Sequence, residues 1–217
     1  MKKLLIVFII AGIGVACSDS VPCRDGLEKR PMYGKVQKCK QQVEQDNQFI
    51  EVSANQYGSR EKASEAMVRF AWKHYAEGNL DASMERFNQG WLLDSLNYEV
   101  YIGFANILSD RGEFEEALPY AEKSVKLNPE SSDNWQFLGA TAETLYFQTK
   151  DEEYLSRSID YLRKSISIDP ENAMSYSILT EVYNLSNQND SARKYMEIAD
   201  RLNPELISQE LRQKIME

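Results

Sequence analysis

Hydrophobic residues between about positions 60 and 204 recur at helical spacing, and the whole pattern returns after about 34 residues. The clearest unit is 98–131, where two amphipathic stretches meet at Asp110-Arg111-Gly112 and the second stops at Asn128-Pro129. Blocks of this length are typical of stacked helical repeats, in which no helix pair buries its apolar face alone. The pattern predicts helix pairs over residues 59–95, 98–131, 132–171 and 173–204.

Large and small residues take regular places within these pairs. Each first helix has two large positions: Met67 and Phe70, Tyr101 and Phe104, Trp135 and Leu138, Tyr176 and Leu179. A smaller residue follows the second of these: Ala71, Ala105, Gly139 and Thr180. Each second helix has two small positions: Ser83 and Gly90, Ala117 and Ser124, Ser158 and Ser165, Ala192 and Ala199. The small positions let helices approach closely, and the large residues fill the space on either side.

A proline closes three of the pairs, at Pro129, Pro170 and Pro204, and Ser95 takes its place in the first pair. Over roughly 60–204 this spacing resembles that of tetratricopeptide repeats. The resemblance implies an all-α, right-handed superhelical solenoid of about four helix pairs, with capping helices at both ends.

The ends of such an array need covering. At the first end, Asp46 precedes an apolar stripe that stops at Gly58, so 46–58 is a predicted N-terminal capping helix. The stripe consists of Phe49, Ile50, Val52 and Tyr57. After Pro204, residues 205–217 alternate apolar and charged residues and predict a C-terminal capping helix, with Leu206, Ile207, Leu211 and Ile215 facing inward.

The third pair is longer than the others, because Gly139 and Pro170 are about seven residues too far apart for a 34-residue unit. The extra length predicts longer helices and a longer turn between Leu145 and Tyr154, exposing some of Tyr146, Phe147 and Tyr154. Insertions often lie on a binding face of repeat proteins, but extra packing within the stack explains this one equally well.

Residues 1–16 have the features of a secretory signal peptide: two lysines, a short apolar run and small residues before Cys17. Gly14-Val15-Ala16-Cys17 resembles a bacterial lipobox, which implies that acyl chains such as palmitate are attached to Cys17 and hold the protein on a membrane. The glycine departs from the usual leucine, and cleavage by ordinary signal peptidase after Ala16 is the alternative. We expect an exported protein, lipid-anchored to a bacterial outer membrane, with its side of that membrane unresolved.

The polar segment 17–45 is interpreted as a tether that contains two further cysteines, Cys23 and Cys39. An even pair in an oxidising compartment favours a disulfide that closes this part of the tether into a loop. Two free thiols are the alternative. With no Cys/His cluster nearby, the pair is not a predicted metal site.

The chain offers little catalytic chemistry. Its single histidine, His74, lies in a repeat helix, and the sequence has no HExxH, phosphate-binding loop or nucleotide-binding glycine motif. We therefore predict no enzyme activity, no cofactor and no metal. The formal net charge of −9 disfavours nucleic acid and anionic lipid surfaces as main partners.

The remaining candidate site is the groove that the resemblance places along the first helices. Its predicted lining is Trp72, Tyr75, Glu99, Asn106, Asp110, Gln136, Glu143 and Glu181. The best-known groove of the resembled family binds an acidic peptide terminus through lysines and arginines, which are missing at these places. Trp72 and Tyr75 are candidate anchors for an apolar or basic segment. Alternatively, they pack on the N-terminal capping helix.

We therefore predict a membrane-anchored, non-enzymatic adaptor that binds a protein or peptide partner through this groove. A self-associating structural spacer and an accessory subunit with a small-molecule site near the third-repeat insertion are the alternatives. The sequence identifies neither the partner nor the oligomeric state.

Overall fold

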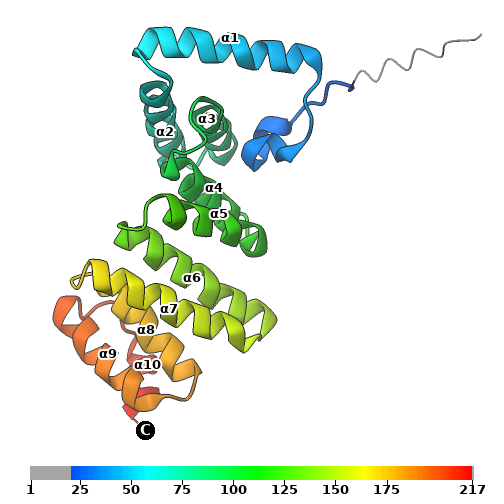
Figure 1. Cartoon of the computed structure of the whole chain (residues 1–217). Helices are drawn as coiled ribbons and strands as arrows, with labels where there is room; N and C mark the ends of the chain where they lie inside the picture. The colour runs from blue at the N-terminus through cyan, green and yellow to red at the C-terminus, as the bar shows by residue number, and fades with distance from the viewer. Residues whose placement is uncertain (1–20, 217) are drawn as a thin grey trace, which may run out of the picture.

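The computed structural model describes residues 21–216, and every regular element within that part is helical (Figure 1). Two short 3-10 helices, η1 (Leu27–Lys29) and η2 (Pro31–Lys35), precede ten α-helices. These are α1 (Lys40–Tyr57), α2 (Arg60–Ala76), α3 (Leu80–Leu93), α4 (Tyr98–Asp110), α5 (Phe114–Leu127), α6 (Ser132–Thr149), α7 (Glu152–Ile168), α8 (Ala173–Leu185), α9 (Asn189–Leu202) and α10 (Gln209–Met216). Helices α2 to α9 form four successive pairs, which confirms the predicted all-α repeat fold.

A residue with left-handed backbone lies in the turn of every pair. Gly78 and Gly112 have φ values of 75° and 76°, and Asn187 occupies the equivalent place in the fourth pair. At these three turns, two backbone N–H groups bond back to the last turn of the helix, as Gly112 N does to Ser109 O (2.9 Å) and Glu113 N to Leu108 O (2.8 Å). This Schellman arrangement satisfies carbonyl groups that the helix end leaves without a partner.

Within the pairs, helices meet closely at small residues. A Cβ added to Gly139 of α6 would lie 2.5 Å from Cγ of Leu162 in α7, so this contact favours glycine strongly. The hydroxyl of Ser158 donates to the Gly139 carbonyl oxygen at 2.8 Å, and Ser83 donates to Ala71 O at 2.9 Å in the first pair. The small residue in the first part of each of these second helices therefore also forms a hydrogen bond to the first helix of its pair.

Most of the repeated large positions lie in the core, and Trp135 is half-buried against it. Phe104, Leu138 and Leu179 are fully buried, whereas Phe70 is 45% exposed. Our prediction of a buried Phe70 was wrong because no repeat precedes α2. The helix that takes that place, α1, packs its apolar residues on Ala63, Ala66, Met67 and Leu93.

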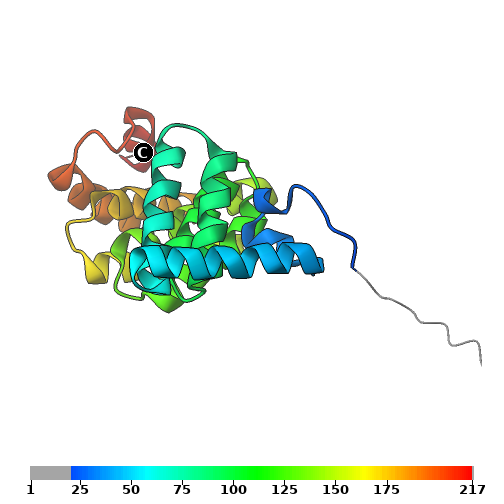
Figure 2. The same ribbon diagram turned by 90° about the horizontal axis from the view of Figure 1, so that it is seen from above.

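Helix α1 runs across the end of the stack formed by α2 and α3 (Figure 2). It begins at Lys40, six residues before the predicted start, so Asp46 does not cap it and instead accepts a hydrogen bond from Lys38 Nζ at 2.6 Å. Phe49, Ile50 and Tyr57 contact the stack as expected, but Val52 is 56% exposed. The apolar stripe is therefore narrower than we predicted.

The tether interpretation of residues 17–45 was wrong for residues 27–35, which dock on the second helices. Asn88 of α3 is fully buried, and its amide nitrogen donates to the carbonyl oxygens of Glu28 (2.8 Å) and Arg30 (2.9 Å). Its carbonyl oxygen accepts from Tyr33 N at 3.2 Å. A disulfide joins Cys23 to Cys39 at the start of α1, so the docked segment lies inside a covalently closed loop.

Charged side chains add to this docking. Lys29 Nζ lies 2.8 Å from Asp81 on α3, and Arg30 pairs with Glu113 and Glu116 at the start of α5. Arg111 donates to the Lys29 carbonyl oxygen at 2.9 Å. The segment thus spans the second helices of the first two repeats.

The third pair is lengthened through its helices, and the predicted longer turn is absent. Only Lys150 and Asp151 separate α6 from α7. Phe147 is 43% exposed, while Tyr146 and Tyr154 are half-buried. The Lys150 ammonium lies 5.3 Å from the ring centres of both Tyr146 and Phe147, so the exposed aromatic surface here is partly covered by a cation.

At the other end, α10 closes the stack with Ile215, which is fully buried beside Ile207. Within residues 21–216, no helix combines the length and apolar character needed to cross a membrane. Cys17 and the predicted signal peptide lie outside the described residues.

Candidate functional site

The first helices α2, α4, α6 and α8 form one row of the stack, and we call their common surface the first-helix face. The predicted groove residues all lie on these helices. Helical spacing places Gln136 and Glu143 on one side of α6, and Glu181 lies on α8.

Trp72 and Tyr75 lie at the α2 end of this face. Their rings meet edge-on, with centres 5.4 Å apart, and Trp72 also packs edge-on against the buried Phe87 at 5.1 Å. Both are half-buried against the main core, and the cluster beneath α1 is a separate one. The alternative that they pack on the capping helix was therefore wrong, and each keeps part of its surface exposed on α2.

Asp110, at the end of α4, lies beside Tyr75. Burial, together with this neighbouring carboxylate, raises the pKa of Tyr75 to about 12. The phenol therefore stays protonated near neutral pH and is suited to donate a hydrogen bond to Asp110. Asn106, one turn earlier on α4, donates from its side chain to Ile102 O at 2.8 Å.

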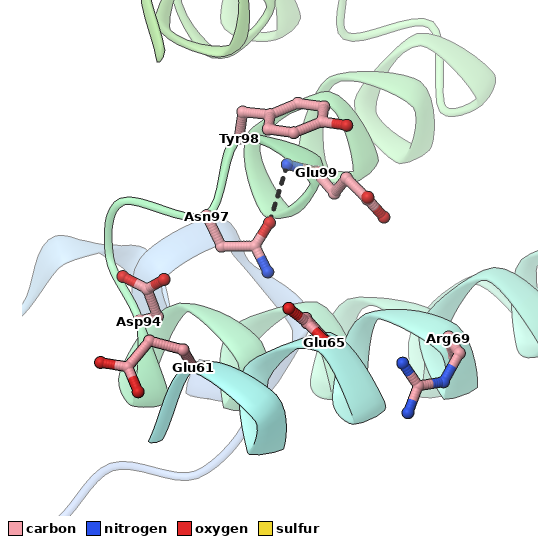
Figure 3. A pocket seen from close by; sticks show the side chains of 7 residues that line it. All are labelled: Glu61, Glu65, Arg69, Asp94, Asn97, Tyr98 and Glu99. Carbon is pink, nitrogen blue, oxygen red and sulfur yellow. Dashed lines mark hydrogen bonds between the residues drawn. The ribbon is translucent and has the colours of Figure 1, made fainter. Parts of the chain in front are cut away.

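Between α2 and α4 the surface is hollowed by about 390 Å³ (Figure 3). Carboxylates line it from both helices and from the loop between the first two repeats: Glu61, Glu65, Asp94 and Glu99. Arg69 is the one cationic side chain among the residues that line this hollow. The loop is held by Asn97, whose side-chain oxygen accepts from Glu99 N at 3.1 Å.

Glu143 and Glu181 form a second acidic feature, between α6 and α8. Glu143 is only 9% exposed, and among the described residues its Oε1 has no hydrogen-bond partner. Burial, and secondarily the Glu181 carboxylate, raises the pKa of Glu143 to about 8. A buried carboxyl without a donor is costly, which marks this position as a candidate site and not merely a packed surface.

Comparison with family models matches residues 98–131 to the tetratricopeptide repeat. Similar solved structures include a MamA protein, at 20% identity and a TM-score of 0.60, which aligns with 70% of this chain and 78% of that chain. The fold is a tetratricopeptide-repeat solenoid. Other similar structures are the thermophilic TPR protein TTC0263 of Thermus thermophilus (22% identity, TM-score 0.56, 70% and 79% covered) and pilF of Pseudomonas aeruginosa (17%, 0.57, 76% and 79%). A comparison with curated proteins finds no match.

In the second, third and fourth repeats, basic residues are absent from the first helices. Helices α4, α6 and α8 contain no lysine, arginine or histidine, but they carry Glu99, Asp110, Asp133, Glu143 and Glu181. The second helices α5, α7 and α9 carry both signs of charge, with basic residues that include Lys123, Arg157, Arg163 and Arg201. The part of the first-helix face formed by α4, α6 and α8 is therefore acidic, whereas α2 carries basic residues beside Glu61 and Glu65. The tetratricopeptide-repeat fold suggests an interaction scaffold for protein partners.

A separate hollow of about 310 Å³ lies next to the third-repeat insertion. Residues from the start of α7 and from the α8–α9 turn line it, including Leu155, Ile159, Leu185 and Gln188. The insertion's aromatic residues Tyr146, Phe147 and Tyr154 are not part of this lining. No cluster of three or more metal-binding side chains occurs in the described part of the chain.

The sequence prediction overlooked Asn88 as the residue that fixes the N-terminal segment. It also gave no special weight to Arg69, Asp94 and Glu61, which complete the hollow of Figure 3. The lack of basic residues in α4, α6 and α8 is visible in the sequence, but it indicates a common surface only when these three helices are known to lie in the same row.

Proposed function

We propose that this protein is a non-enzymatic adaptor that binds a cationic segment of a protein partner along its first-helix face. The observation that carries the proposal is the acidic surface of α4, α6 and α8, helices that hold no basic residue. Opposite charge across an interface accelerates encounter and excludes partners of the wrong sign. Trp72 and Tyr75 supply aromatic surface that is immobilised at little entropic cost, as is typical of interface anchors.

We further propose that the adaptor is held on the bacterial outer membrane through lipid on Cys17. The lipobox-like Gly14-Val15-Ala16-Cys17 supports this anchor. Residues 18–26 span at most roughly 30 Å when fully extended, and the chain beyond them docks on α3. An anchored stack would therefore stay close to the membrane surface.

Affinity capture tests the adaptor function. The full chain is solubilised in detergent from its native envelope, and captured proteins are identified by mass spectrometry. Glu99→Lys places a cation on the acidic face, and the matched control Glu197→Lys makes the same charge change on the exposed side of α9. We expect wild type and the control to capture the same partner and Glu99→Lys to lose it. Equal capture by all three proteins would count against the first-helix face as the binding surface.

A self-associating spacer is the second candidate, and the exposure of Phe70 favours it, because α1 leaves this large apolar residue uncovered at the end of the stack. Sedimentation of the purified chain over a hundredfold concentration range tests this candidate. A mass that rises with concentration in wild type and not in Phe70→Ser would support the spacer.

A further inference from the structure

Glu143 combines deep burial with an unmet hydrogen-bonding requirement. It lies on α6 toward α8, 9% of its surface stays exposed, and no donor reaches its Oε1 from the described residues. Such groups in folded proteins usually have a donor or an ordered water. The unpaired Oε1 of Glu143 therefore points to a hydrogen-bond donor that is supplied by another molecule.

The neighbouring group adds negative charge to this position. Glu181 on α8 is the charged residue whose field acts on Glu143, and it is partly exposed. Two carboxyl groups side by side disfavour ionisation of the more buried one. A cation placed between them would remove that repulsion and supply the missing donor.

Two carboxyl groups, those of Glu143 and Glu181, suit some kinds of cation better than others. A divalent metal ion takes several oxygen ligands, and the described residues hold no cluster of three metal-binding side chains. A lysine ammonium or an arginine guanidinium needs only one or two acceptors and brings its own N–H donors. A peptide side chain therefore fits this pair better than a metal ion does.

We propose that Glu143 and Glu181 form the subsite of the groove that receives one lysine or arginine side chain of the partner segment. This inference rests on the proposed adaptor function and specifies one contact within it. In this proposal, repeats three and four recognise one lysine or arginine at a fixed position of the partner segment. The acidic surface of α4, α6 and α8 adds a less specific electrostatic attraction.

Selection of peptides tests the subsite. A phage-displayed library of random dodecapeptides is selected against the detergent-solubilised full chain, and enriched peptides are synthesised. We expect the enriched peptides to share a lysine or arginine at one fixed position. Replacing that residue with norleucine, which keeps the apolar stem, should weaken binding at least tenfold in a fluorescence anisotropy titration.

Substitution of Glu143 in the protein tests the same contact from the other side of the interface. Glu143→Gln keeps the shape of the side chain but cannot ionise when a cation binds beside it. We therefore expect this variant to bind the lysine peptide at least tenfold more weakly than wild type and the norleucine peptide less than twofold more weakly. Glu197→Gln, on the exposed side of α9, is the matched control and should leave both affinities unchanged. Circular dichroism confirms that each variant is folded.

The possible failures can be told apart. If the wild type enriches no peptide, the adaptor function and the subsite are both overturned. If peptides bind but share no fixed cation, or bind Glu143→Gln as tightly as wild type, the subsite is overturned and the adaptor stands. If calcium or zinc ions alone raise the melting temperature of wild type but not of Glu143→Gln, the pair is a metal site and the subsite proposal is wrong.

Discussion

The side-chain amide of Asn88 donates a hydrogen bond to the carbonyl oxygen of Glu28, 2.8 Å away and sixty residues earlier in the chain. With its bonds to Arg30 and Tyr33, this buried amide holds the N-terminal segment on α3. The segment and the first repeat are therefore one structural unit, and the segment is not a free linker.

Asn88→Ala should release this segment. The substitution leaves the carbonyl groups of Glu28 and Arg30 without their donor, a loss of about 1–3 kcal/mol of stability. Urea unfolding measures the loss, and hydrogen exchange over residues 27–35 should become faster than in wild type. Gln89→Ala on the same helix, where the side chain bonds to Glu85 and Arg86, is the control and should change little. Unchanged exchange in Asn88→Ala would show that the ion pairs alone hold the segment.

Reduction of the Cys23–Cys39 disulfide should also destabilise the chain. Closing a loop of about 15 residues lowers the conformational entropy of the unfolded chain. In the loop-closure treatment this stabilises the folded state by about 3 kcal/mol. Urea unfolding with and without dithiothreitol measures the difference, and Cys23→Ser/Cys39→Ser should behave as the reduced wild type. If the oxidised and reduced proteins unfold at the same urea concentration, the bridge adds no stability.

Gly139→Ala should destabilise the third repeat, since the new methyl group would lie 2.5 Å from Cγ of Leu162. Overpacking of this kind costs about 1–3 kcal/mol. Leu162→Val in the same molecule should recover part of the loss, so that a double-mutant cycle gives a favourable coupling energy. Strict additivity of the two substitutions would contradict the close contact.

Glu143 should make stability depend on pH in a specific direction. The folded chain holds the Glu143 proton up to about pH 8, because burial raises the pKa of this carboxyl, whereas the unfolded chain releases it near the ordinary value of 4.5. The folded state therefore binds more protons between these values, and stability falls as pH rises through this window. At about 1.4 kcal/mol per pH unit, the change in the free energy of unfolding amounts to roughly 5 kcal/mol over this window.

Glu143→Gln removes this titration, so its free energy of unfolding should fall less than that of wild type between about pH 5 and pH 8. Urea unfolding at several pH values measures both curves, and Glu197→Gln should keep the wild-type slope. Parallel curves for wild type and Glu143→Gln would show that the carboxyl titrates normally.

The repeat architecture was predictable because the same spacing of large and small residues recurs along the chain, as in Phe104, Leu138 and Leu179. The prediction failed for Phe70 because its burial depends on what precedes the first repeat. It also failed for residues 27–35, whose docking is made by main-chain groups that meet Asn88 across a long stretch of chain. Patterns of side-chain type carry no information about such contacts.

The candidate groove was partly predictable. Glu143 and Glu181 were recognised as outward positions of first helices, from the resemblance to tetratricopeptide repeats. Their mutual proximity depends on how α6 and α8 stack, and the burial of Glu143 depends on the residues around it. Neither quantity can be obtained from the periodicity of one helix.

Site-specific photo-crosslinking in cells tests the central claim most directly. A photo-reactive amino acid replaces Gln136 on the first-helix face in one strain and Glu197 on α9 in another, and crosslinked proteins are identified by mass spectrometry. We predict that position 136 captures one specific protein partner, through a segment rich in lysine or arginine, and that position 197 does not. Capture of the same partner from position 197 with none from position 136 would contradict binding along the first-helix face.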